Sequence, residues 1–278
     1  MKSINETVGE DFSGRLIKDF LRQKLSLSVT LIKKVKFGGV FVNGECVTMR
    51  KILTLGDSVT VNMPSGEDSE HVEPIDMPLG VLYEDEYMLA VDKPINMPTH
   101  PSRYNSLVTL ANLVRAYVGE AFVFRAITRL DRDTSGIVLI AKDQRTASLL
   151  SAEMKAQKIE KTYSAILRNA PSELSGTVCA PIEREAPDSI KRIVREDGKS
   201  AITEYKVTEI LSDGRAVCEV KPITGRTHQI RVHMAYIGAP LDKDFLYGER
   251  SEGENYSLRC VRLTFTHPYT KDKITINA

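Results

Sequence analysis

Apolar residues follow a helical period near the start of the chain. Between residues 15 and 25 they recur every three to four positions, which predicts an amphipathic helix. A second helix is predicted over residues 28–35, with Ser28 as its N-cap and Gly38 and Gly39 ending it. The spacing therefore predicts a pair of helices at the start of the chain.

A strand pattern replaces the helical one after this pair. Asn43-Gly44 separates two short apolar runs, and Asn-Gly is the strongest short signal for a hairpin turn. Residues 58–63 alternate between apolar and polar side chains, which predicts a further strand. The helices and strands together would make a compact unit over residues 1–64.

The segment 65–77 separates that unit from the rest of the chain. It holds five acidic residues and no Lys or Arg, and Pro74 lies near its end. A polar, acidic segment of this kind predicts a linker. Residues 78–278 then form one large unit without an apparent internal repeat.

The large unit mixes strands and helices, which is typical of an α+β domain. Ile137–Ala141 has no charged side chain, so neither face of a strand formed by these residues would be charged. We therefore expect a central strand that is covered on both faces. The other expected elements are two strands around an acidic turn at 81–94, a helix near 107–117, a helix capped by Asp143, a strand at 161–167, a strand at 217–220 and a helix that opens near 225.

Four charged residues stand directly before the apolar strand, in the segment Thr128–Gly136 (TRLDRDTSG). An ordinary surface turn and an active-site loop both fit this pattern. Asp131 would lie near the interior, where a carboxylate is unfavourable unless a cation or several hydrogen bonds compensate. Arg231, in a second polar cluster, could reach Asp131 and hold it ionised. Tyr163 could offer a ring for stacking and a hydroxyl group.

The composition narrows the class of protein only partly. The apolar share is 42% and the charged share is 27%, which is typical of a soluble globular protein. No apolar run approaches the ~20 residues of a membrane helix, and the first residues lack an apolar signal core. The four cysteines are far apart without a CxxC pair, so free thiols are expected. We therefore expect a cytoplasmic protein that has no membrane partner.

Charge is unevenly distributed although the net charge is only +1. Residues 1–64 hold ten Lys and Arg against six Asp and Glu, a balance of +4. Lys33, Lys34 and Lys36 lie on or beside the second predicted helix, where they could contact phosphates. A solvated, purely structural charged surface fits the same pattern.

Other chemistries find little support in the residues. His228 and His233 are five positions apart, which puts them on different sides of a helix, so we expect no metal site. Asp131 and Asp133 could bind Mg²⁺ for phosphoryl transfer, but further carboxylates are missing from the pattern. A glycosidase would need a second acid and stacking aromatics, whereas Trp is absent and aromatics are 6%. Asp131 and Arg231 could also form a purely structural pair. No cofactor is expected.

The N-terminal unit resembles a known RNA-binding module. Its helix, Gly-Gly pair, Val-Phe-Val-Asn-Gly hairpin and Leu-Gly-Asp-Ser-Val strand are similar to the alpha-L module over roughly residues 12–64. The resemblance implies that this unit binds RNA through its lysines. A small unit that only packs or dimerises remains the alternative.

The large unit resembles the RluA-type pseudouridine synthases. The motifs that carry the resemblance, in chain order, are Val91–Pro94, His100-Pro101, Arg129–Asp131, Thr134–Gly136, Ala141-Lys142, Lys161–Ala165, Gly225–His233, Gly238–Gly248 and Leu263–Pro268. The family's fold is a mixed, largely antiparallel sheet with flanking helices. The resemblance implies an enzyme that isomerises uridine to pseudouridine in structured RNA without a cofactor.

The resemblance also implies roles for single residues. Asp131 would be the catalytic aspartate, which either attacks the uridine or removes a ribose proton, and Arg231 would be its ion-pair partner. Tyr163 would lie against the flipped base, Arg129 would fill the space that the base leaves, and Leu263 would form part of the pocket floor. Asp133 would be structural. Basic residues in one stretch, Lys191 and Arg192 among them, would clamp the RNA.

Two departures from the family's pattern bear on function. Thr128 stands where the family usually has His, which would alter an RNA contact beside Asp131. The usual Gly-Asp is replaced around Lys243-Asp244. We expect a monomeric enzyme that acts on large-subunit ribosomal RNA, with transfer RNA as the second choice. The alternative is a non-catalytic RNA-binding or assembly protein that has kept the fold.

Overall fold

The computed structural model describes residues 3–25, 27, 29–62, 72–101, 108–119, 122–248 and 257–278. Its helices are η1 (Glu10–Phe12), α1 (Ile17–Asp19), η2 (Phe20–Lys24), α2 (Val29–Val35), α3 (Leu110–Val118), α4 (Gln144–Lys155) and α5 (Gln229–Tyr236). None of these helices is long and apolar enough to cross a membrane.

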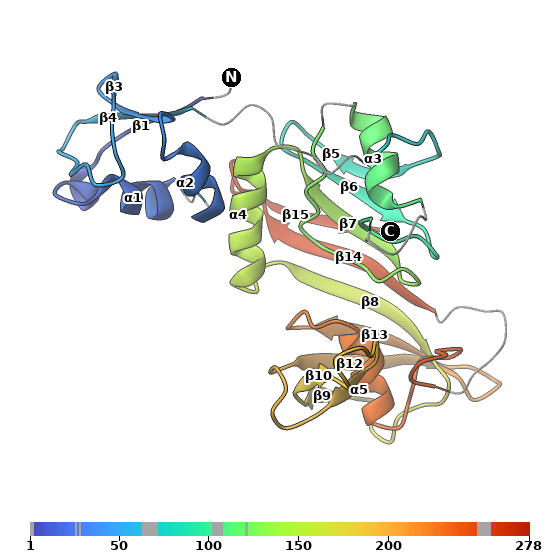
Figure 1. Ribbon diagram of the computed structural model, residues 1–278. Helices are drawn as coiled ribbons and strands as arrows, with labels where there is room; N and C mark the ends of the chain where they lie inside the picture. The colour runs from blue at the N-terminus through green and yellow to red at the C-terminus, as the bar shows by residue number, and fades with distance from the viewer. Residues whose placement is uncertain are drawn as a thin grey trace.

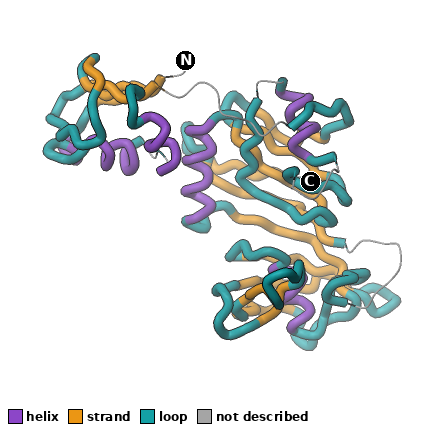
Figure 2. Tube along the Cα trace, in the orientation of Figure 1, coloured by secondary structure: helices purple, strands orange, loops and turns teal. Residues whose placement is uncertain are grey.

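The strands belong to three sheets (Figures 1 and 2). The small sheet has the order β1-β4-β2-β3, with β1 (Ser3–Thr7), β2 (Val40–Val42), β3 (Glu45–Cys46) and β4 (Ser58–Asn62). The large sheet contains β5 (Gly80–Glu84), β6 (Met88–Lys93), β7 (Ser135–Ala141), β8 (Glu160–Leu167), β9 (Ser175–Cys179), β12 (Ile202–Ile210), β13 (Ala216–Pro222), β14 (Leu258–Thr266) and β15 (Lys273–Asn277). A separate hairpin pairs β10 (Ile182–Arg184) with β11 (Arg192–Val194).

The N-terminal residues have their own hydrophobic core. The predicted hairpin is confirmed: Asn43 and Gly44 have φ of 51° and 85°, as a two-residue hairpin turn with both central residues left-handed requires. The helix predicted over residues 15–25 is confirmed from Ile17 to Lys24, but it is not a regular α-helix. Helix α1 passes into the wider turn η2, which a hydrogen bond from the Leu25 N–H to the Phe20 carbonyl closes. Strand β1 escaped prediction because Ile4 is its only buried side chain.

The large sheet confirms the α+β class and its largely antiparallel character. Its order is β5-β6-β7-β14-β8-β13-β12-β9, with β15 on β14, and β7 and β14 form its parallel pair. Strand β7 lies inside the sheet and is buried from Gly136 to Ala141, as the uncharged sequence predicted. The loop Thr128–Gly136 therefore enters the sheet near its centre.

Helices cover parts of this sheet. Helix α4 packs on β7, and its N-cap Asp143 accepts a hydrogen bond from the Thr146 N–H at 2.9 Å, as predicted. Helix α3 begins after Thr109, which forms a capping box with Asn112. Helix α5 lies against β11, β12 and β13, below β8 in the view of Figure 1, whereas α3 and α4 lie above β8.

The second half of the predicted linker contacts α3. The Ile75 N–H donates to the Asn112 carbonyl, the Asn112 side chain donates to the Glu73 carbonyl, and Arg115 donates to the Val72 carbonyl. Residues 63–71 lie outside the described part of the chain. The unit boundaries at 64 and 78 stay predictions.

Gly136 is required where β7 meets β14. Its φ is +106°, and a Cβ at this position would lie 2.7 Å from the Cys260 main-chain nitrogen and overlap its carbonyl oxygen. Gly136→Ala is expected to lower the free energy of unfolding by roughly 2–4 kcal/mol, through strain and overlap together. Gly214→Ala is the matched control, since Gly214 also has positive φ, +88°, but no atom near its Cβ position. Urea unfolding of both variants checks this, and equal losses would contradict the close approach.

Candidate active site

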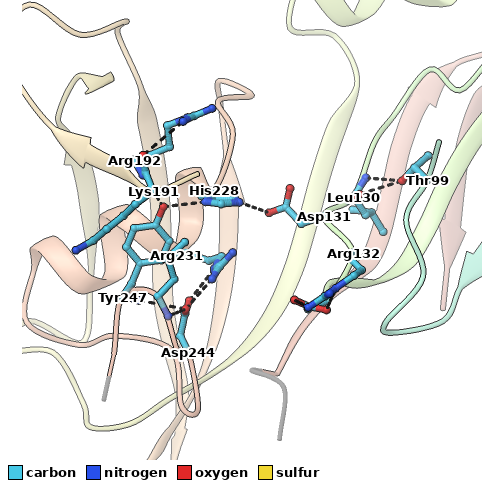
Figure 3. Close-up of polar contacts among 12 residues, drawn as sticks. Thr99, Leu130, Asp131, Arg132, Lys191, Arg192, His228, Arg231, Asp244 and Tyr247 are labelled. Atoms are coloured by element: carbon cyan, nitrogen blue, oxygen red, sulfur yellow. Dashed lines mark hydrogen bonds and ion pairs between the residues drawn. The ribbon is translucent and has the colours of Figure 1, made fainter. Parts of the chain in front are cut away.

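An open cleft of about 660 Å³ lies between the Thr128–Gly136 loop and the start of α5. Strand β8 contributes Lys161 and Tyr163 to its wall, and the end of α4 contributes Met154 and Lys155. Figure 3 shows Asp131 and the side chains of α5 facing one another across this space. The cleft brings together Arg129, Asp131, Tyr163 and Arg231, four of the residues that the sequence singled out.

The main chain of the Thr128–Gly136 loop is fixed on both sides of Asp131. The Thr99 hydroxyl donates to the Leu130 carbonyl at 2.9 Å (Figure 3), and the Thr134 N–H donates to the Asp131 carbonyl at 3.1 Å. The Thr128 hydroxyl accepts a hydrogen bond from the Leu139 N–H at 2.8 Å, and Thr128 is buried. Thr128 therefore ties the loop to β7, and because it also lines the cleft, the expected change in RNA contact stays a prediction.

Lys93 binds the main chain of the same loop. Its ammonium group is fully buried and donates to the main-chain carbonyls of Pro94 at 2.8 Å, Met97 at 2.7 Å and Arg132 at 3.1 Å. Burial lowers the pKa of Lys93 to about 8, against the opposing charges of Asp133 and Asp131. The sequence contains the motif Val91–Pro94, but it does not indicate that Lys93 binds the main chain of Arg132, 39 positions later.

The lowered pKa of Lys93 predicts a stability change with pH. Between about 8 and the ordinary value of 10.5, the unfolded chain keeps the Lys93 proton that the folded chain releases, so rising pH favours the folded state through this group. The difference in unfolding free energy between wild type and Lys93→Met should therefore shift in favour of the wild type from pH 8 to pH 10. Urea unfolding at several pH values measures this difference, and a difference that stays constant would show that Lys93 has an ordinary pKa.

Asp133 has the structural role that was expected. Arg132 donates to both of its carboxylate oxygens, from Nε at 2.6 Å and from Nη2 at 3.0 Å. The Asp133 side chain is buried, whereas that of Asp131 is 36% exposed to solvent. Of the two acids in the loop, Asp131 is the one that a substrate can reach.

The expected ion pair between Arg231 and Asp131 is replaced in the structure. Arg231 donates to both carboxylate oxygens of the fully buried Asp244, at 2.7 Å each (Figure 3). The Leu246 N–H also donates to Asp244, which holds that carboxylate in place. Lys243, at the departure from the family's pattern, adopts φ of 62° in the left-handed region that favours glycine, and the adjacent Asp244 is the counter-ion of Arg231.

The Asp131 carboxylate faces the imidazole of His228. His228 Nε2 lies 4.0 Å from Asp131 Oδ2, and its Nδ1 lies 2.8 Å from the Tyr247 hydroxyl oxygen (Figure 3). Burial lowers the pKa of His228, so its imidazole is neutral at pH 7. Sequence reasoning weighed His228 only as a metal ligand. The feature of the sequence that could have indicated its location is that His228 comes directly before the first turn of α5.

Tyr163 lies in the cleft wall as predicted, and Leu263 does not. Burial raises the pKa of Tyr163 well above its usual value near 10, so its phenol stays protonated. Leu263 is fully buried opposite Lys161, whereas Leu258 of the same strand lines the cleft. Leu258 pairs with Ala165 and Leu263 with Lys161, so the two leucines stand beside different parts of β8.

The predicted RNA-binding residues lie in three places. Arg129 is exposed at the cleft, and Lys33, Lys34 and Lys36 are exposed on or next to α2. Lys191 and Arg192 are half-buried at the β10–β11 hairpin, where Lys191 forms an ion pair with Glu185 at 3.6 Å. Of these basic residues, Arg129 is the one that lines the cleft. Among the residues that the structure describes, no cluster of His, Cys, Asp and Glu could hold a metal ion.

Comparisons with known proteins agree with this fold. The model of the RNA pseudouridylate synthase family matches residues 87–236. The uncharacterized RNA pseudouridine synthase YjbO of Bacillus subtilis (strain 168) is 38% identical over 261 residues, which cover 92% of each protein. The ribosomal large subunit pseudouridine synthase D of Xanthomonas campestris pv. campestris is 34% identical and covers 95% of this chain and 82% of its own length.

A solved structure agrees as well. Human RNA Pseudouridylate Synthase Domain Containing 1 superposes with a TM-score of 0.61 at 25% identity and covers 72% of this chain and 83% of that one. The chain therefore belongs to the RNA pseudouridine synthases, a family of isomerases. Within that family its synthase domain is of the RluA type, as the sequence motifs predicted.

Proposed function

We propose that this chain isomerises uridine to pseudouridine in large-subunit ribosomal RNA, with Asp131 as the catalytic group. The observation that carries the proposal is the partly exposed Asp131 carboxylate in a cleft that also holds Tyr163 and Arg231. The choice of RNA rests on the relative that is named a ribosomal large subunit pseudouridine synthase. A cytoplasmic, monomeric protein fits the same proposal.

The isomerisation breaks the bond between N1 of uracil and C1′ of ribose and forms a bond from C5 to C1′. C5 loses a proton and N1 gains one, so atoms and electrons balance within the nucleoside. Asp131 either attacks the uridine or removes a ribose proton, and both roles require the ionised carboxylate. Arg231, held by Asp244, supplies a fixed positive charge to the cleft wall where the detached uracil would carry negative charge.

The uridine must leave its stack to reach this cleft. Flipping a base costs a few kcal/mol, and less in loops and single strands. The neutral phenol ring of Tyr163 offers a surface for the flipped uracil, and the exposed Arg129 is placed to enter the vacated space. Leu258 takes the place in the pocket that the sequence had assigned to Leu263.

The N-terminal unit is proposed to add affinity that does not depend on sequence. Its lysines Lys33, Lys34 and Lys36 are exposed, and Lys36 Nζ lies 4.3 Å from the ring centre of Phe37. Phe37 is 83% exposed, so its ring can stack with an unpaired base. These features support the resemblance of the unit to the alpha-L RNA-binding module. The half-buried Lys191 and Arg192 would clamp the RNA from the β10–β11 hairpin.

Release of tritium from C5 of labelled uridine tests this function. Unmodified transcripts of large-subunit ribosomal RNA and of transfer RNAs, each labelled at C5, are incubated separately with the enzyme. Release from the ribosomal transcript alone is the expected result, and mapping of pseudouridine then identifies the position. A triple variant with Lys33→Glu, Lys34→Glu and Lys36→Glu should raise KM and weaken the salt dependence while kcat stays close to wild type.

The other results separate the alternatives. Release from transfer RNA alone would overturn the ribosomal substrate and leave the chemistry in place. No release from either RNA, despite salt-dependent binding, would favour a non-catalytic RNA-binding or assembly protein. An unchanged KM in the triple variant would remove the N-terminal unit from the RNA-binding surface.

A further inference from the structure

We propose that His228 is a positioning residue for Asp131: Tyr247 holds its imidazole with the hydrogen on Nε2, and this N–H faces the Asp131 carboxylate. The kinetic part of this inference rests on the proposed catalytic function of Asp131, whereas the state of the imidazole does not. The argument starts from the contacts of the Tyr247 hydroxyl group.

The Tyr247 hydroxyl joins two segments of the chain. Its oxygen accepts a hydrogen bond from the Arg192 main-chain N–H at 2.9 Å, and it lies 2.8 Å from His228 Nδ1. A phenol has a single hydrogen to donate. With Arg192 N–H acting as a donor to the oxygen, Nδ1 of His228 is the acceptor that the structure offers for that hydrogen.

This arrangement fixes the tautomer of His228. A neutral imidazole that accepts at Nδ1 carries its hydrogen on Nε2. Nε2 is the atom that lies 4.0 Å from Asp131 Oδ2. The opposite tautomer would point the Nε2 lone pair at the carboxylate, which is repulsive, so both sides of the ring favour the same state.

Burial keeps the imidazole of His228 neutral. Burial is the main cause that lowers its pKa, and the nearby Arg231 and Arg192 lower it further, while Asp131 and Asp244 oppose them. Burial also raises the pKa of Tyr247 to about 12, so its phenol keeps the hydrogen that it donates. A neutral donor can orient Asp131 without neutralising it as a salt bridge would.

The distance between His228 Nε2 and Asp131 Oδ2 shows how the two side chains interact in the protein without RNA. At 4.0 Å the Nε2–Oδ2 pair is about 1 Å longer than a hydrogen bond, so Asp131 is oriented by the N–H and still free to meet a substrate. The backbone of His228 is held at φ of 56°, and the ring packs edge-on against Tyr247 at 5.7 Å between centroids. The imidazole is therefore fixed by its surroundings rather than by Asp131.

The same hydroxyl connects Asp131 to the basic β10–β11 hairpin. Arg192 contributes its main-chain N–H to Tyr247, and its side chain belongs to the proposed RNA clamp. A movement of the hairpin would change the hydrogen bond at the Tyr247 oxygen, and through it the donor that faces Asp131. The structure thus links the hairpin to the catalytic residue by three consecutive contacts, Arg192 to Tyr247, Tyr247 to His228, and His228 to Asp131.

Nitrogen NMR of the free protein tests the tautomer without any RNA. Histidine labelled with ¹⁵N reports which ring nitrogen carries the hydrogen, and the signal of His228 among the five histidines is the one lost in His228→Gln. The wild type should show the Nε2–H tautomer at pH 7. Tyr247→Phe should yield a mixture of tautomers, and Tyr236→Phe, which alters an exposed tyrosine at the end of α5, should leave the signal unchanged. An Nδ1–H or a charged His228 in the wild type would overturn the proposal.

Kinetics test the positioning role. His228→Leu should lower kcat roughly 10- to 100-fold with a smaller change in KM, because misplacing a catalytic group lowers the reaction rate by factors of this size. His228→Gln, whose amide N–H can reach the same place, should recover part of kcat. A loss confined to KM, or equal kcat in the Leu and Gln variants, would assign His228 to RNA binding or to packing. If the wild type shows the Nε2–H tautomer but no activity, the proposed function has failed and the structural part of the inference stands.

Discussion

Asp131→Asn is expected to lower tritium release from labelled RNA by at least roughly 10³-fold, because the amide can neither attack the uridine nor accept a proton. The side chain keeps nearly the same size, and the partly exposed Asp131 carboxylate lies 4.0 Å from the neutral His228, so the fold should not depend on its charge. Single-turnover release from the ribosomal transcript, with enzyme in excess, measures this loss.

Two controls separate chemistry from binding. Asp76→Asn changes an exposed acid next to the synthase domain and should leave the rate at the wild-type level. RNA binding by Asp131→Asn, measured at two salt concentrations, should match the wild type, because phosphate contacts and not Asp131 supply the affinity. If Asp131→Asn retains most of its rate, the catalytic group is another residue of the cleft.

Local patterns predicted the position of Asp131 because the information lies in adjacent residues. Ile137–Ala141 has no charge, which fixes β7 as an interior strand and places the preceding loop at the centre of the sheet. The Asn43-Gly44 turn was predictable for the same reason, since one dipeptide determines its backbone. The exposure of Asp131 and the burial of Asp133 then decide which acid meets the substrate, and only the structure shows that difference.

The partners of Asp131 and Arg231 were not predictable in this way. Arg231 binds Asp244 because the chain turns back at Lys243 in a left-handed conformation that the lysine itself does not signal. Leu258 and not Leu263 lines the cleft, although both leucines belong to β14 and both pair with residues of β8. Both outcomes depend on contacts between distant segments, which no local period encodes.

The buried pair of Arg231 and Asp244 leads to the second large effect. Asp244→Asn is expected to lower the free energy of unfolding by about 3–5 kcal/mol, because it removes the negative charge that accepts two hydrogen bonds from the buried Arg231 guanidinium. Both side chains are nearly inaccessible, at 4% and 0% exposed. The same change should also reduce activity, since Arg231 lines the cleft and loses the carboxylate that orients it.

Two further variants decide whether the buried charge is the cause. Asp197→Asn breaks the ion pair with Arg195 on the surface, where such pairs contribute only about 0–1 kcal/mol, so its stability should stay close to wild type. The double variant Arg231→Met with Asp244→Leu removes both charges together and should regain most of the stability lost in Asp244→Asn, because no unpaired charge remains buried. It should stay inactive, since the cleft then lacks the guanidinium. A double variant no more stable than Asp244→Asn would show that the lost packing and hydrogen bonds around Asp244, and not the unpaired charge, account for the destabilisation.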